Sequence, residues 1–181
     1  AIAHSLGVPL FVDAAQTLGK VPLTHLVEVA TAIALSPHKC GGLRGHGVLI
    51  VHDLTSRLRP LARGGGQEHG LRPGTQSPAL AAANALAIEQ AANEVAMRAA
   101  NMAAVRDAFV RGVRASLVEH DVMSPLATSL PNTVMLRFPH VDGRNLLPAL
   151  DLAGIHASHG SACSSGAPTP PRILLAMGLS E

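Results

Sequence analysis

The sequence predicts an α/β protein with a parallel or mixed sheet, followed by a second, smaller α/β layer sandwich. Three observations favour this fold class. Short apolar runs of strand length alternate with helical segments in the first third of the chain, a long alanine-rich helical segment follows, and strand-like and helical segments alternate again beyond it. Such a sheet is covered on both faces and binds ligands at the carboxyl ends of its strands.

Three strands are expected in the first domain. The opening "AIAHSLG" is typical of a last helical turn that Gly7 ends. Buried strands are then predicted by three apolar, β-branched runs, "VPLFVD" (8–13), "TAIALS" (31–36) and "GVLIVHD" (47–53), with a short helix around "LTHLVEV" (23–29) between the first two. The glycine-rich loop "RGGGQEHGLRPGT" (63–75) is expected to fold closely around another group.

A long helix is predicted from the N-cap Ser77 and the proline Pro78 to about Glu119, connecting two domains. Its apolar face is expected to contain Met102, Val105, Phe109, Val113 and Leu117. The remaining segments are expected to be a strand at "NTVMLRF" (132–138), an amphipathic helix at "GRNLLPALDLAG" (143–154), a strand near "IHASHG" (155–160) and a helix at "PRILLAMGL" (171–179).

Composition argues against several classes of function. The net charge is +2, with 14% charged and 2% aromatic residues, so neither a basic face nor a stacking platform for nucleic acid is indicated. No apolar run approaches a membrane span of roughly 20 residues, and the first residues lack a signal-peptide pattern, so a cytoplasmic location is expected. The two cysteines form no CxxC pair and the ten histidines no zinc motif, so we expect free thiols and no metal site.

Lys39 lies between the second predicted strand and a glycine turn, and its neighbours at the same sheet edge suit pyridoxal phosphate. A lysine whose pKa is lowered by burial and cationic neighbours can form a Schiff base with this aldehyde. Asp13 can keep the cofactor's ring nitrogen protonated, and Gln16 can donate to its phenolic oxygen. The candidate phosphate donors are Ser36, His38 and Thr75. Singly, such residues are more often turn caps or surface charges, and it is their joint arrangement that favours a cofactor site.

The two cysteines are expected to differ in role. Cys163 lies among very small residues in "GSACSSGAPTP" (160–170), a loop able to move, and beside such a cofactor it is a candidate nucleophile. Taken alone, it would more often be an incidental small residue in a flexible loop. Cys40 directly follows Lys39 and is expected to be packed in the turn. The runs "GGLRGHG" and "LGKV" lack the context of a dinucleotide or ATP phosphate loop.

Several motifs resemble the cysteine desulfurases, which belong to the class V aminotransferase superfamily and have the type I fold of pyridoxal phosphate enzymes. They occur in family order across almost the whole chain: "VDAAQTLGKVPL", "SPHKCGG", "GGGQEHGLRPGT", "LPNT", "VDG", "GSACSSG" and "ILLAMGLS". The resemblance implies part of a large cofactor-binding domain with a mainly parallel sheet at residues 1–92. A linking helix and part of a small domain would follow at residues 93–181.

The resemblance also implies roles for the site residues. Lys39 would hold pyridoxal phosphate and move the substrate's α-proton, Asp13 would pair with the ring nitrogen, and Gln16 would contact the ring oxygen. Ser36 and His38 would bind phosphate, and Thr75 would reach the phosphate of the other subunit in a homodimer. The Cys163 thiolate would take sulfur from L-cysteine, leaving alanine and an enzyme persulfide, and would pass it to an acceptor such as an iron–sulfur scaffold protein.

Two alternatives stay open at this point: a selenocysteine lyase, and a catalytically incomplete dimerisation fragment. The chain departs from the family pattern at His69, where arginine is usual, at Gln76, where glutamate is frequent, and at Cys40, where a bulky residue is frequent. The first residue is not methionine, and family members are longer. We therefore expect a fragment lacking sequence at both ends, which alone would bind cofactor weakly and turn over poorly.

Overall fold

The computed structural model describes residues 2–52, 58–159 and 172–178, and it divides the chain into two compact units. The first unit contains residues 1–107 with 130–132, and the second contains residues 108–129 with 133–181. Each unit is described by itself. The division into family domains at residues 92 and 93 stays a prediction.

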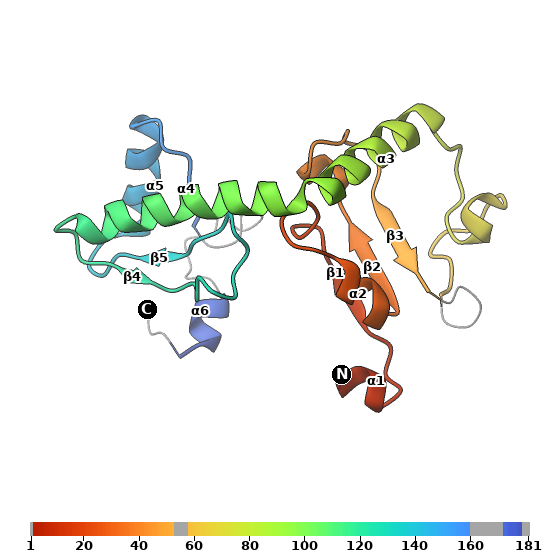
Figure 1. Cartoon of the computed structure of the whole chain (residues 1–181), viewed down its shortest axis with the longest axis horizontal. Coiled ribbons are helices and arrows are strands. Elements are labelled where there is room, and N and C mark those ends of the chain that lie inside the picture. The colour runs from red at the N-terminus through yellow and green to blue at the C-terminus, as the bar shows by residue number, and fades with distance from the viewer. Residues whose placement is uncertain (1, 53–57, 160–171, 179–181) are drawn as a thin grey trace. The chain divides into compact units, whose positions relative to one another are not determined.

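The first unit is built on a three-stranded mixed sheet in the order β1-β2-β3 (Figure 1). Its strands are β1 (Phe11–Asp13), β2 (Ala32–Leu35) and β3 (Val48–Val51), each within a segment predicted as a strand. β1 and β2 are parallel, with Asp13 opposite Ala34, while β2 and β3 are antiparallel, with Leu35 opposite Val48. The two carboxyl ends of β1 and β2 therefore lie together at one sheet edge.

Short helices flank these strands. They are α1 (Ile2–Ser5), α2 (Thr24–Val29) and two 3₁₀ turns, η1 (Pro37–Lys39) and η2 (Gln67–Gly70). Gly7, with φ of +63°, ends the first helical turn as predicted. Ile33 of β2 is fully buried and lies in an apolar core with Ala14, Leu18, Ala30, Leu35, Cys40 and Ala91. The core is therefore formed by the sheet, by the turn after β1 and by a helix from much later in the chain.

That later helix begins as predicted but does not continue to Glu119. The Ser77 hydroxyl accepts from the Leu80 N–H, and α3 spans Pro78–Asn93. Glu94 then leaves helical geometry, with φ of −98° and ψ of 5°, before α4 (Val95–Ala115). The predicted continuous helix is thus two helices, α3 and α4. They follow each other directly, and the Arg98 N–H donates a backbone hydrogen bond to the Glu94 carbonyl (Figure 1).

The apolar face expected on this segment was only partly correct. Met102 and Val113 are half-buried, but Val105 and Phe109 are exposed and Leu117 lies beyond the end of α4. The buried residue of α4 is Val110, at 2% exposure, so the buried face is rotated relative to the predicted one. The hydrophobic pattern alone did not predict which face of α4 is buried, because apolar residues occur on more than one side of the helix.

The second unit contains a two-stranded antiparallel sheet and two helices. β4 (Asp121–Val122) pairs with β5 (Leu136–Arg137), and these are followed by α5 (Gly143–Leu152) and α6 (Arg172–Ala176). The Asp142 carboxylate caps α5 by accepting from the Arg144 N–H at 2.9 Å. β4 was not predicted, and β5 covers only residues 136–137 of the strand predicted at 132–138.

The strand predicted near residues 155–160 is not formed at 155–159. The Ile155 N–H instead bonds to the Leu150 carbonyl at 2.8 Å, and Gly154, with φ of +75°, closes the end of α5. This is the hydrogen-bond pattern of a Schellman cap, which directs the backbone of Ile155 back to the helix. Among the described residues, no helix is both long enough and apolar enough to span a membrane.

Candidate active site

The sheet edge where β1 and β2 end carries most of the predicted site. Asp13 is the last residue of β1, and Ser36 directly follows β2 and leads into η1, which contains His38 and Lys39. The Ala14 N–H bonds to the Ala34 carbonyl at 2.9 Å, so the parallel pairing extends to the start of the turn after β1. Since parallel strands end at the same edge, Asp13 and the turn that carries Lys39 both lie at that edge.

Hydrogen bonds define the backbone around these residues. Asp13 Oδ1 accepts from the Ala15 N–H at 3.0 Å, which holds the carboxylate at the strand end. The Lys39 N–H bonds to the Ser36 carbonyl at 3.0 Å, and Pro37, which begins η1, is fully buried. The side chains of His38 and Lys39 are nevertheless exposed, so the lysine is anchored through its backbone rather than by burial of its amine.

The buried amine at this edge belongs to Lys20, a residue that the sequence reasoning did not select. Lys20 is 6% exposed, and its Nζ donates to Gln16 Oε1 at 2.8 Å. Burial lowers the pKa of Lys20, the positive charge of Lys39 lowers it further, and the Cys40 side chain acts in the opposite direction. Lys20 is therefore bonded to Gln16 and lies within the electrostatic influence of Lys39. No local signal in the sequence indicated this role, because Lys20 stood out only as the lysine of "LGKV", which lacks the context of a phosphate loop.

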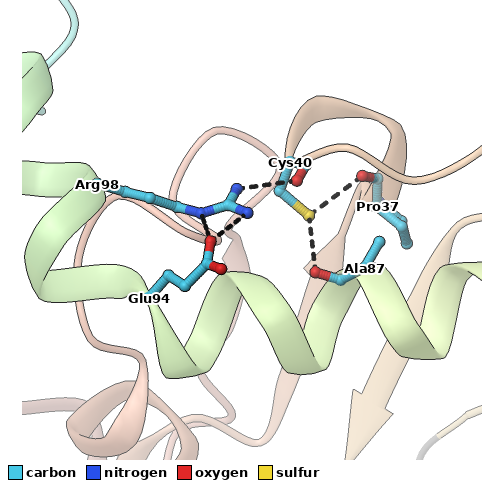
Figure 2. A network of polar contacts seen from close by, with 5 residues as sticks. All are labelled: Pro37, Cys40, Ala87, Glu94 and Arg98. Atoms are coloured by element: carbon cyan, nitrogen blue, oxygen red, sulfur yellow. Dashed lines mark hydrogen bonds and ion pairs between the residues drawn. The ribbon is translucent and has the colours of Figure 1, made fainter.

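Cys40 is packed in the turn, as expected. Its Sγ lies 3.1 Å from the Pro37 carbonyl oxygen and 4.0 Å from that of Ala87 in α3 (Figure 2). Burial raises the pKa of the Cys40 thiol, against smaller opposing effects of Arg98, of the Gly42 N–H and of Lys20. A thiol must be deprotonated to act as a nucleophile, so Cys40 is suited to packing rather than to chemistry.

Arg98 ties the same turn to α4. Its Nη1 donates to the Cys40 carbonyl at 3.1 Å, and its Nη2 forms an ion pair with Glu94 Oε2 at 2.8 Å (Figure 2). On the other side of the turn, Asn84 of α3 accepts from the Leu43 N–H at 2.7 Å through its Oδ1. Two helical residues far away in sequence thus fix the backbone on the C-terminal side of Lys39.

Thr75 and Cys163 are not brought to this edge by any described contact. Thr75 is exposed in the loop after η2, where Glu68 and His69 both have positive φ and Gln76 Nε2 donates to Glu68 Oε1 at 2.6 Å. Non-glycine residues at positive φ are uncommon and strained, so the backbone here needs supporting contacts, and the Gln76–Glu68 hydrogen bond is one of them. Cys163 lies outside the described residues.

Asp13 and the turn that carries Lys39 thus follow the carboxyl ends of neighbouring parallel strands in an α/β sheet. The chain belongs to the aminotransferase class V family, whose sequence model matches residues 1–176. It is similar to a cysteine desulfurase of Gluconacetobacter diazotrophicus (35% identity) and to the cysteine desulfurase NifS of Azotobacter vinelandii (34% identity). Each alignment covers 98% of this chain and 44% of the relative.

Solved structures agree with this assignment. A NifS-like protein matches with a TM-score of 0.81 at 34% identity, covering 96% of this chain and 44% of that chain. A structure described as SspA in complex with cysteine matches with a TM-score of 0.72 at 28% identity, covering 99% of this chain and 49% of that one. The α/β fold of the pyridoxal phosphate enzymes of type I is therefore confirmed. The chain spans less than half the length of each of these four relatives.

Class V aminotransferases and cysteine desulfurases use pyridoxal phosphate, and the residues at this edge fit that cofactor. An exposed amine (Lys39), a fixed carboxylate (Asp13) and an exposed carboxamide (Gln16) lie on neighbouring strand ends and turns. When bound, the cofactor supplies an aldehyde that condenses with amines and a ring that accepts electrons. These are the groups that would hold the cofactor.

Proposed function

We propose that this chain is part of a cysteine desulfurase in which Lys39 holds pyridoxal phosphate. The observation that carries the proposal is the parallel pairing of β1 and β2, which places Asp13 and the turn bearing Lys39 at one edge. The relatives named as cysteine desulfurases support the same activity. Asp13 is assigned to the ring nitrogen, Gln16 to the ring oxygen, and Ser36 and His38 to the phosphate.

The chain's own groups then have defined tasks. The Lys39 amine takes the proton from the α-carbon of L-cysteine, and it can reach substrate because its side chain is exposed while its backbone is fixed. Cys163 is assigned as the sulfur acceptor: its thiolate bonds to the substrate sulfur as the carbon–sulfur bond breaks, which yields a persulfide and, after protonation, alanine. Cys40, buried and with a raised pKa, is the less suitable of the two thiols.

Borohydride reduction tests the cofactor assignment directly. The chain is incubated with pyridoxal phosphate, reduced, digested and mapped by mass spectrometry. Lys20 and Lys39 are the only lysines of the chain, so the reduced cofactor can be attached to either of two side chains. We expect it on Lys39. Lys39→Ala should abolish specific capture, whereas Asp13→Ala should weaken it. A mark on Lys20 alone, or none, would contradict the proposal.

Substrate and sulfur transfer need a separate measurement. The longest natural form of the protein is supplied with L-cysteine, and alanine and protein-bound persulfide are quantified. We expect both products, and we expect Cys163→Ser to lose the persulfide. If the protein acted on L-selenocysteine but not on L-cysteine, the proposed substrate would be wrong and L-selenocysteine would take its place.

Assembly is proposed on the same basis. We assign a cytoplasmic homodimer in which Thr75 contributes to the partner's phosphate site, with a sulfur-accepting scaffold protein as the downstream partner. Mixing Lys39→Ala with Thr75→Ala subunits tests this arrangement, because one of the two sites in a hybrid dimer would then be intact. Recovery of alanine production on mixing is expected, and no recovery would contradict a shared site.

A further inference from the structure

We propose that Lys20 is a positioning residue that turns the Gln16 carboxamide so that its N–H₂ group faces the cofactor. This inference rests on the proposed function, because the group to be positioned is the one assigned to the ring oxygen. It concerns a residue to which neither the sequence motifs nor the family resemblance gave a role.

The chemistry of the ammonium fixes the orientation of the amide. Lys20 Nζ lies 2.8 Å from the Gln16 side chain, and an ammonium has hydrogens to donate but no lone pair with which to accept. The oxygen of Gln16 must therefore face Lys20, which leaves Nε2 on the other side of the carboxamide. Since Lys20 is buried and Gln16 is exposed, the oxygen faces inward and the donor nitrogen faces the open side of the sheet edge.

The backbone between the two residues is equally constrained. The Thr17 N–H bonds to the Ala14 carbonyl at 2.9 Å, and the Lys20 N–H bonds to the Thr17 carbonyl at 3.0 Å. Gly19, at φ of +72°, lies so close to α3 that a Cβ there would be 3.1 Å from Ala91 Cβ. The backbone of this turn thus holds Gln16 and Lys20 at a fixed separation that allows their side chains to form the hydrogen bond.

The position of Lys20 is unfavourable for simple packing. A buried ammonium is costly unless it is well paired, and within the described part of the chain Lys20 forms no ion pair with a carboxylate. The charge of Lys39 lies near it as well, which adds repulsion. A methionine of similar length would fill the same space without either cost, so a role that needs the donor explains the lysine better.

A double-mutant cycle on cofactor affinity tests the assignment. The dissociation constant of pyridoxal phosphate is measured by absorbance titration for the longest natural form of the protein and for its Lys20→Met, Gln16→Met and double variants. Each single change is expected to weaken binding by about five- to tenfold, the effect of one hydrogen bond. Because Lys20 acts through Gln16, the double variant should bind about as weakly as Gln16→Met alone. Lys20→Arg, which keeps a donor, should recover part of the affinity.

A second readout needs no cofactor. In ¹⁵N-labelled chain, the two protons of the Gln16 carboxamide should give separate, slowly exchanging signals that shift or broaden in Lys20→Met. Unchanged affinity and unchanged amide signals in Lys20→Met, or additive losses in the double variant, would overturn the assignment while Lys39 capture stands. Failure of borohydride capture at Lys39 in the wild-type chain would instead overturn the proposed function, and this inference with it.

Discussion

Gly42→Ala is expected to destabilise the chain, because the turn that carries Lys39 leaves no room for a methyl group at this position. A Cβ on Gly42 would lie 2.5 Å from Asn84 Oδ1 and 2.9 Å from both the carbonyl carbon and the Cβ of Pro37. Carbon contacts become favourable only near about 3.5 Å. The Asn84 amide could shift, but Pro37 is fully buried at the start of η1 and cannot.

The size of the effect follows from these contacts. Forcing an extra carbon into a close-packed site costs about 1–3 kcal/mol. Asn84 can move away only by giving up the hydrogen bond that it accepts from the Leu43 N–H at 2.7 Å, which adds about 1 kcal/mol. The total loss in the free energy of unfolding is then about 2–4 kcal/mol. For a chain of this length, the thermal midpoint should fall by about 4–16 °C.

Thermal unfolding followed by far-ultraviolet circular dichroism measures this loss. Gly112→Ala is the matched control, because Gly112 lies within α4 and a Cβ there would meet no atom within 4 Å. Removing a glycine from a helix interior should stabilise the chain by about 0.5–1 kcal/mol. If Gly42→Ala unfolded within about 1 °C of the wild-type chain, the packing described for this turn would be refuted.

Three further predictions concern the same region. Cys40 should resist alkylation in the folded chain and react in urea, because burial raises the pKa of its thiol, and equal rates seen by mass spectrometry would contradict this. The pKa of Lys20 is lowered from 10.5 in the folded chain, so folding disfavours its charged form, and the folded chain becomes more stable as the pH rises toward 10.5. Lys20→Met should therefore stabilise the chain at lower pH, and this gain, measured by urea unfolding, should shrink as the pH approaches 10.5. Arg98→Met should lower the free energy of unfolding by about 1–2 kcal/mol, because it removes the hydrogen bond to the Cys40 carbonyl, whereas Glu94→Gln should lower it by less than about 1 kcal/mol. Equal losses in the two variants would show that the ion pair, and not the bond to Cys40, carries the effect.

The parts of the fold that could be predicted are those that local sequence determines. Apolar, β-branched runs marked β1, β2 and β3, and the Ser77–Pro78 pair marked the start of α3. Parallel strands end at one edge, so the placement of Asp13 and of the turn that carries Lys39 at that edge followed once the strand ends were correct. The site was therefore predictable to the extent that it is a property of strand ends.

Other features depend on contacts between distant residues and gave no local signal. Glu94 is a good helix former, yet the helix breaks there, where the next turn supplies Arg98 to the Cys40 carbonyl. Likewise, no sequence pattern showed that Lys20 would be buried and Lys39 exposed, since burial depends on contacts between residues distant in sequence. Lysine next to glycine suggested only a phosphate loop, which the context had already excluded.

The separation between a fixed backbone and a free side chain at Lys39 is itself an argument about mechanism. The Lys39 N–H is bonded to Ser36, the next carbonyl is held by Arg98, and the Gly42 N–H is bonded to the Pro37 carbonyl at 2.9 Å. Under the proposed function, Lys39 first holds the cofactor covalently and then carries a proton, which requires an amine that can move while its backbone stays in place. Burial of the Lys39 amine would have served only the first task. In this chain the buried amine is that of Lys20, where it can hold Gln16 without moving, and the exposed one remains free for chemistry.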